Sequence, residues 1–335
     1  MKIKQLPMKK HDLISTYNID ASFVSMALSY ESTEPWLCSN FIQLKSFKGS
    51  PQNFFYESQH EYDTPFFAVQ RIGKDLINKK WEDIIQFIID SIDTNYYILM
   101  MINKKHLAVY KNLNIPEFIH DVFIYGYDLD QKLIYLAGNF LKGKYSFITC
   151  SFDDIRSAYI HSFKEGLFDW LYGVVLYQYR DTEKHKVDPD IRSRIKTLLG
   201  HYLDSTHMNL LDLNRTTHYD REQLLYGHDV YRNVIDHYTS NEDNHIDIRP
   251  FHLFLDHKKF MLYRFNYLTT NQYIEKKSID LESLSELITL TEIHRNLVLR
   301  FNITKDLKLK NDILNRLNSF IEKEQEVYKG IISFL

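Results

Sequence analysis

The stretch FIHDVFIYGYD, residues 118–128, places a histidine at the start of an alternating run of apolar residues. The imidazole of His120 is a candidate general base, because its ordinary pKa lies close to neutral pH. The next apolar run ends in LAGNF, which contains Asn139. If the two runs pair as a hairpin about a turn at 128–131, residue 120 lies opposite residue 139. We therefore predict that Asn139 lies at the same end of the hairpin and can orient the imidazole.

These residues also have ordinary structural interpretations. One histidine among fifteen needs no chemical role, and His120 could bond a loop carbonyl. A Gly-Asn pair such as Gly138-Asn139 is common in turns. Cys38 and Cys150 are the two thiols of the chain, and free cysteine is most often buried and unreactive. Cys150 falls within an apolar run, so Cys38 is the one thiol that can be nominated as a nucleophile.

The elements that must position these residues change in character near residue 155. Before it, short apolar runs alternate with turn signals, which predicts a sheet with a few helices. A helix is expected over 21–30, capped by Asp20, and an amphipathic helix over 79–93. Another helix should begin after Ser151, with Ser151 as its N-cap. The expected strands are 95–102, 121–128, 132–140 and 144–152.

From about residue 165 onward, long segments with a period of 3.6 residues predict an almost wholly helical part. Asp188-Pro189 is expected to open the first of these helices, because proline is favoured at the first helical position. Asp280 is expected to cap a later one. The remaining amphipathic segments lie near 226–240, 249–268 and 311–335.

Composition limits the classes of function. The 41 basic and 44 acidic residues are spread along the chain, for a net charge of -3, so no basic stripe indicates a nucleic-acid partner. No apolar run reaches the roughly 18–20 residues that span a bilayer, and none near the start resembles a signal peptide. We therefore expect a cytoplasmic protein with no membrane partner. Two cysteines are too few for a cysteine zinc site, and neither a metal nor another cofactor is expected.

Four stretches carry a resemblance to known proteins. HDVFIYGYD (120–128) and KYSFITCSFDDIRSAY (144–159) resemble the butirosin-biosynthesis acyltransferase family, whose papain-like domain is related to bacteriocin-processing cysteine peptidases. YGHDVYRNVIDHY (226–238) and HIDIRPFHLFLDHKKFMLYRFNYL (245–268) are similar to helical tails of proteins encoded beside nonribosomal peptide synthetase genes in bacilli. The resemblance implies a role in acyl transfer from a carrier protein during antibiotic biosynthesis.

The resemblance also implies an α+β architecture, with a papain-like domain and antiparallel sheet over 1–165 and a helical domain over 166–335. In the papain-like scheme a cysteine opens the first helix and a histidine heads a central strand. An asparagine or aspartate orients that histidine, so that the imidazole can activate the thiolate. Here the expected helix start reads STYNIDASFVSM (15–26), which contains no cysteine.

Two hypotheses from different classes follow, and the oligomeric state stays open in both. In the first, the chain is a thiol-dependent acyl or peptidyl transferase or hydrolase that acts on carrier-bound thioesters. Cys38 attacks, His120 carries the proton and Asn139 orients His120. In the second, the chain is a catalytically inactive papain-like binding module that docks on a synthetase or its product. A weaker variant of the first replaces the thiol by the hydroxyl of Ser22.

Overall fold

The computed structural model describes residues 2–57, 64–140, 143–164, 166–181, 190–206, 223–241, 244–275, 277 and 279–335. The chain forms two compact units, each of which combines separate stretches of sequence. We call residues 1–33 with 59–186 the sheet unit. Residues 34–58 with 187–335 are the helical unit.

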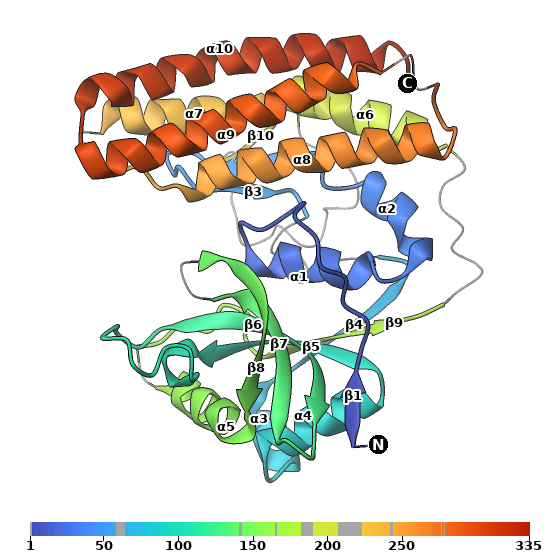
Figure 1. Cartoon of the computed structure of the whole chain (residues 1–335), viewed down its shortest axis with the longest axis vertical. Helices are drawn as coiled ribbons and strands as arrows, with labels where there is room; N and C mark the ends of the chain where they lie inside the picture. The colour runs from blue at the N-terminus through green and yellow to red at the C-terminus, as the bar shows by residue number, and fades with distance from the viewer. Residues whose placement is uncertain are drawn as a thin grey trace. The chain divides into compact units, whose positions relative to one another are not determined.

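The sheet unit is built on a seven-stranded antiparallel sheet with the order β4-β9-β5-β6-β7-β8, in which β1 also pairs with β6. Figure 1 shows α1 on one side of this sheet and α3, α4 and α5 on the other. The helices are α1 (Asn18–Ala27), α3 (Lys74–Lys80), α4 (Ile84–Asp93) and α5 (Phe152–Ile160). The strands are β1 (Ile3–Gln5), β4 (Phe67–Ile72), β5 (Tyr96–Asn103), β6 (Ile119–Asp128), β7 (Leu133–Asn139), β8 (Tyr145–Ser151) and β9 (Val174–Tyr179).

Local sequence explains most of these elements. The continuous apolar run of β5 is buried on both faces of the sheet, as a central strand requires. The hydroxyl of Ser151 accepts a hydrogen bond from the backbone N–H of Asp154, which confirms the predicted cap of α5. The segment predicted as one helix over 79–93 is instead divided. Asp83 adopts an extended conformation and its carboxylate caps α4, which ends the helical run at that point.

Besides the short helix over residues 34–38, the helical unit contains five longer helices over the described residues, and α8, α9 and α10 run beside one another (Figure 1). The predicted Asp280 cap of α9 is confirmed by its bond from the N–H of Ser283. Asp188-Pro189 lies outside the described residues, and Asp190 caps the following helix. The helices are α6 (Ile191–Leu203), α7 (His228–Ser240), α8 (Arg249–Thr270), α9 (Leu281–Thr304) and α10 (Leu307–Ile332).

The predicted division at residue 165 differs from the observed units in two ways. First, β9 lies beyond it and fills the place between β4 and β5, so the expectation of a wholly helical second part is wrong there. Second, residues 34–58 belong to the helical unit. They form α2 (Glu34–Cys38), β2 (Leu44–Phe47) and β3 (Asn53–Phe55), and β2 also pairs with β10 (Leu224–Tyr226).

Three side chains of the helical unit explain why 34–58 joins it. The buried guanidinium of Arg264 donates to the carbonyls of Cys38 and Phe41, at 2.6 and 3.1 Å. His257 Nε2 lies 2.8 Å from the carbonyl of Ile42. Asn233 donates to the carbonyl of Phe47 at 3.0 Å. Backbone carbonyls that leave water need such partners, so these bonds favour this packing over a place in the sheet unit.

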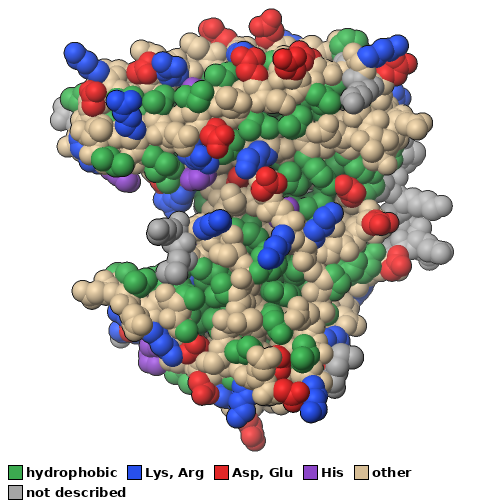
Figure 2. Space-filling view, viewed as in Figure 1, with side chains coloured by type: hydrophobic (Ala, Val, Ile, Leu, Met, Phe, Trp, Pro, Cys, Tyr) green, Lys and Arg blue, Asp and Glu red, His purple; other side chains and the backbone are tan. Residues whose placement is uncertain are grey.

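The helices and the charged side chains bear on possible contacts with membranes and charged partners. No helix over the residues that the structure describes is long and apolar enough to cross a membrane. On the face drawn in Figure 2, basic and acidic side chains are interspersed, and neither sign gathers into one large patch.

Candidate functional site

His120 lies at the start of β6, and its side chain is 47% exposed. Its Nδ1 is 2.6 Å from a carboxylate oxygen of Asp121, the next residue of the strand. That contact places a proton on Nδ1, because a carboxylate can only accept. The other ring nitrogen, Nε2, forms no hydrogen bond with any described residue. The neutral imidazole therefore presents Nε2 as an open acceptor or base.

Asp121 is buried beneath this imidazole. Burial alone would raise the pKa of Asp121, but the hydrogen bond from His120 and the positive charges of His120 and Lys104 lower it below its ordinary value. The amide of Asn18 adds a further bond to the other carboxylate oxygen. Asp121 is consequently held as a carboxylate, which can both orient His120 and stabilise its protonated form.

Lys104 supplies a second cation to the same carboxylate. It opens η2 (Lys104–His106), directly after β5, and its side chain is buried over the ring of Phe140. Its Nζ donates to the carbonyl of Asn139 at 2.9 Å and lies 3.4 Å from His120 Nδ1. Burial lowers the pKa of Lys104 to about 8, against the opposing effect of Asp121. We call Asn18, Lys104, His120 and Asp121 the His120 cluster.

Asn18 is the first residue of α1 and joins the His120 cluster to the core of that helix. Its Oδ1 accepts from the hydroxyl of Ser22 at 3.0 Å, and the hydroxyl of Tyr145 lies 3.3 Å from Ser22 Oγ. Gly138 allows this approach, since a Cβ there would lie 3.2 Å from Asn18 Oδ1. Ser22 is wholly buried, so the structure gives its hydroxyl no access to a substrate.

Asn139 does not orient His120, which corrects the prediction from the hairpin. Its amide nitrogen donates to the carbonyls of Ser15 and Thr16, both at 3.1 Å, and its Oδ1 is buried without a partner among the described residues. The register explains the difference. Asp128 pairs with Leu133 rather than with residue 131, which offsets the register by two residues, and the irregularity between Ile124 and Gly126 removes one of the two. Continued along the hairpin, that register brings Asp121 rather than His120 opposite Asn139.

The thiols are the second correction. Cys38 belongs to α2 of the helical unit, is fully buried, and has a pKa raised by burial to about 12. Cys150 is buried in β8, and burial raises its pKa to about 12 as well. A thiol acts as a nucleophile through its thiolate, and neither cysteine forms one near neutral pH. The proposed role of Cys38 as nucleophile therefore has no support.

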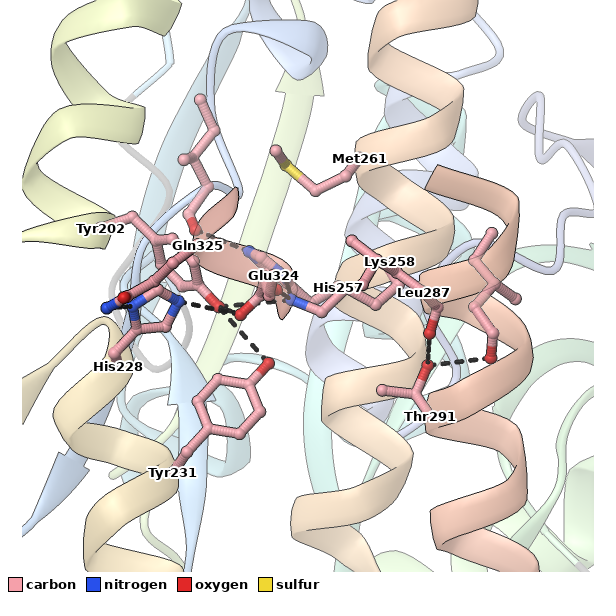
Figure 3. Close-up of polar contacts among 12 residues, drawn as sticks. Tyr202, His228, Tyr231, His257, Lys258, Met261, Leu287, Thr291, Glu324 and Gln325 are labelled. Atoms are coloured by element: carbon pink, nitrogen blue, oxygen red, sulfur yellow. Dashed lines mark hydrogen bonds and ion pairs between the residues drawn. The ribbon is translucent and has the colours of Figure 1, made fainter. Parts of the chain in front are cut away.

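The helical unit holds another cluster of the same residue types, which we call the Lys258 network (Figure 3). Lys258 and Glu324 form an ion pair with at most 1% of either side chain exposed. The other oxygen of Glu324 accepts from His228 Nε2 and from the hydroxyl of Tyr202, both at 2.9 Å. His257 Nδ1 lies 2.7 Å from the amine of Lys258.

Burial dominates the titration of this network. It lowers the pKa of His228 to about 3, assisted by the charge of Lys258, and lowers the pKa values of His257 and Lys258 well below their ordinary values. The hydrogen bonds agree with neutral imidazoles, because His228 Nδ1 lies 3.1 Å from the amide nitrogen of Gln325. With its polar groups bonded inside and closed to solvent, this network stabilises the packing of helices and offers nothing to a ligand.

Two hollows among the described residues do not include these clusters. A hollow of about 640 Å³ in the sheet unit is lined by residues in and next to α3, α4 and α5, including the aromatic Trp81, Tyr159 and Phe163. A hollow of about 790 Å³ in the helical unit is lined by residues such as Arg192, Tyr273 and Phe334. Within the described part of the chain, no three His, Cys, Asp or Glu side chains are placed to hold a metal ion.

The sequence pointed to His120 but missed its partners. Asp121 follows the histidine directly in the sequence, so it could have been considered. Lys104 and Asn18 are distant in sequence, and only the tertiary fold places them beside His120. No protein-family model matches the chain, and no curated protein is significantly similar to it. The arrangement of the His120 cluster is therefore the main guide to function.

Proposed function

We propose that this chain is a non-catalytic, cytoplasmic binding module of nonribosomal peptide assembly, related in scaffold to the papain-like acyltransferases. It binds the acyl or peptidyl group of a carrier-bound thioester at the His120 cluster and does not transfer that group. One observation carries the proposal. The residue that opens α1 is Asn18, whose amide is bonded to Asp121, where a thiol enzyme of this kind would place its cysteine.

The open imidazole supports binding at this cluster. His120 Nε2 can accept a hydrogen bond from an amide N–H, and both a peptidyl group and the pantetheine arm of a carrier contain such donors. The carboxylate of Asp121, 2.6 Å from Nδ1, holds the ring in place. Lys104 acts on the ring through its charge, which helps to keep Asp121 ionised. A ring that is fixed before binding loses less rotational freedom when a ligand arrives, which favours affinity.

A second function is favoured by the contact of Asp121 with Nδ1, which is the arrangement of a general base. In this alternative, His120 Nε2 takes a proton from water as the water oxygen attacks the thioester carbonyl. The carbon–sulfur bond then breaks, and the imidazolium returns the proton to the leaving thiolate. The products are a carboxylic acid and a free thiol, and no thiol of the protein takes part.

Titration calorimetry and a thiol-release assay separate these functions. The probes are N-acetylcysteamine thioesters that carry a short acyl group or an aminoacyl group. Binding to the wild-type chain without release of thiol supports the binding module, and His120→Gln should then weaken binding at least tenfold. Thiol release that His120→Gln abolishes and Cys38→Ala preserves would support base catalysis instead. Release that depends on Cys38, or no binding of either probe, would overturn the proposal.

A further inference from the structure

Two histidines outside the His120 cluster stack on each other. His106 ends η2, and His161 begins η4 (His161–Phe163), the short helix that follows α5. Their ring centroids are 3.9 Å apart and their planes differ by 16°. Ser157 of α5 contacts both rings, with its hydroxyl 3.0 Å from His106 Nδ1 and its carbonyl 2.8 Å from His161 Nδ1. The stack therefore ties η2 to the end of α5.

One nitrogen of this stack is left without a partner. His106 Nε2 is buried and has no hydrogen bond among the described residues. A carboxylate oxygen of Glu117 lies 4.0 Å from this nitrogen, and the second oxygen of that carboxylate pairs with Lys164. Lys105 and Lys111 also face His106, and Lys111 pairs with Asp154. Burial, followed by the neighbouring His161, lowers the pKa of His106.

We propose that the stacked pair His106–His161 is a proton-sensitive contact that controls the position of η2, and with it the His120 cluster. When both rings are neutral, they stack and η2 is fixed. A proton added to His106 gives Nε2 a hydrogen that the carboxylate of Glu117 can accept. Closing the 4.0 Å gap to hydrogen-bond distance draws the ring out of the stack.

The movement reaches the His120 cluster because η2 is only three residues long. Lys104 is its first residue and His106 its last, so a shift of His106 displaces the lysine that faces His120 and Asp121. Mild acid would therefore loosen the support of the open imidazole. The claim that this contact controls ligand binding rests on the proposed function. The claim that protonation of His106 moves η2 does not.

The test is an NMR titration of the histidine rings in the full chain without ligand, between pH 8 and pH 5. Because burial and the neighbouring His161 lower the pKa of His106, we expect the signals of His106 to titrate below the ordinary value of about 6.5. The signals of His120 should show a shift that follows the titration of His106. In His161→Phe, which keeps a stacking ring but cannot be protonated, His106 should titrate in a single step at higher pH.

A second variant tests the acceptor. In Glu117→Gln, His106 should still titrate, but the coupled shift of His120 should fall at least twofold, because the attraction to a carboxylate is gone. Titration of His106 near pH 6.5, unchanged in His161→Phe, would overturn the inference. The same conclusion would follow if the signals of His120 behaved alike in wild type and His161→Phe. No thioester is present in this experiment, so a failure of the binding proposal leaves its result unchanged.

Discussion

The His120 cluster and the Lys258 network contain the same kinds of groups, a histidine, a lysine and a carboxylate in mutual contact, but they differ in access to solvent. His120 has 47% of its side chain exposed, whereas His228 has none. In the first cluster Nε2 stays open. In the second, both nitrogens of His228 are bonded, to Glu324 and to Gln325. Residue types alone therefore do not define a binding site, because a ligand needs a donor or acceptor that is not already bonded within the protein.

The difference in access to solvent also decides whether each cluster contributes to stability or to binding. A sealed ion pair is costly to break, because the remaining partner is left charged and without water. A half-exposed group can be removed at little cost, because water replaces its partners. We therefore expect substitutions in the Lys258 network to act on stability and substitutions of His120 to act on binding.

The largest effect is expected for Lys258→Met. Without the amine, the buried carboxylate of Glu324 loses its ion-pair partner, and the free energy of unfolding should fall by about 3–5 kcal/mol. Urea unfolding followed by far-UV circular dichroism measures the change. Lys323→Gln is the matched control, because the Lys323–Glu286 pair is on the surface, with 36% and 52% of the side chains exposed. That control should cost less than about 1 kcal/mol.

Equal stability of Lys258→Met and Lys323→Gln would contradict the difference between buried and exposed pairs. The double variant Lys258→Met with Glu324→Leu tests whether the unpaired carboxylate causes the loss. Removing both charges leaves no unpaired ion, so most of the lost stability should return. If the double variant were less stable than Lys258→Met alone, the network would be held by contacts other than the ion pair.

The thiols test whether a reactive group has been overlooked. With pKa values near 12, Cys38 and Cys150 should react with iodoacetamide at pH 7 about a thousandfold more slowly than a free thiol. Mass spectrometry before and after addition of urea measures this, with the unfolded chain as control. Rapid labelling of Cys38 in the folded chain would restore the thiol mechanism.

Acid should destabilise the Lys258 network. Burial lowers the pKa of His228 to about 3 in the folded chain, whereas the unfolded value is about 6.5. Below pH 6.5 the unfolded chain thus binds the extra proton, and stability falls with pH until about pH 3. The loss approaches 1.4 kcal/mol per pH unit, or about 2 kcal/mol by pH 5. Unfolding in urea at pH 7, 6 and 5 measures it.

His228→Gln provides the control for this acid effect. The variant removes the titrating group, so the loss of stability between pH 7 and pH 5 should become smaller. Equal slopes in wild type and variant would show that His228 is not kept neutral by its surroundings.

The smallest effect on stability is expected for His120→Gln. Because half of the side chain is exposed, the free energy of unfolding should change by less than about 1 kcal/mol. Asp121→Asn is the matched comparison within the same cluster. It removes a buried charge that is bonded to His120 and Asn18 and attracted by Lys104, so it should cost about 1–3 kcal/mol. Urea unfolding at pH 7 distinguishes the two, and a larger loss for His120→Gln would contradict the view of an open cluster.

Much of the sheet unit could be predicted from sequence, because its strands are marked by apolar runs and its α5 cap by Ser151. Strand β9 was missed for a physical reason. It is buried between two strands, so its apolar run is continuous and its period cannot distinguish strand from helix. The place of residues 34–58 depends on contacts such as Arg264 to Cys38, which are 226 residues apart.

The candidate site shows the same limit. His120 was identified because a histidine at a strand start is a local signal. Asp121 was not expected to orient it, because neighbouring residues of a strand point to opposite faces. The observed contact depends on how the His120 ring turns back along the strand. The prediction for Asn139 assumes a hairpin that closes at residues 128 and 131, whereas the strands pair from Asp128 and Leu133. The length of the turn therefore decides the partner of Asn139, and the apolar pattern does not specify it.

The most direct test is to titrate an aminoacyl N-acetylcysteamine thioester into two variants by calorimetry, with their folding checked by circular dichroism. One is His120→Gln, and the other is the double variant Lys258→Met with Glu324→Leu. We predict that binding weakens at least tenfold in His120→Gln and stays within about twofold of wild type in the folded double variant, since about 1.4 kcal/mol corresponds to tenfold. Unchanged binding in His120→Gln, with binding lost in the folded double variant, would contradict the assignment of function to the open cluster.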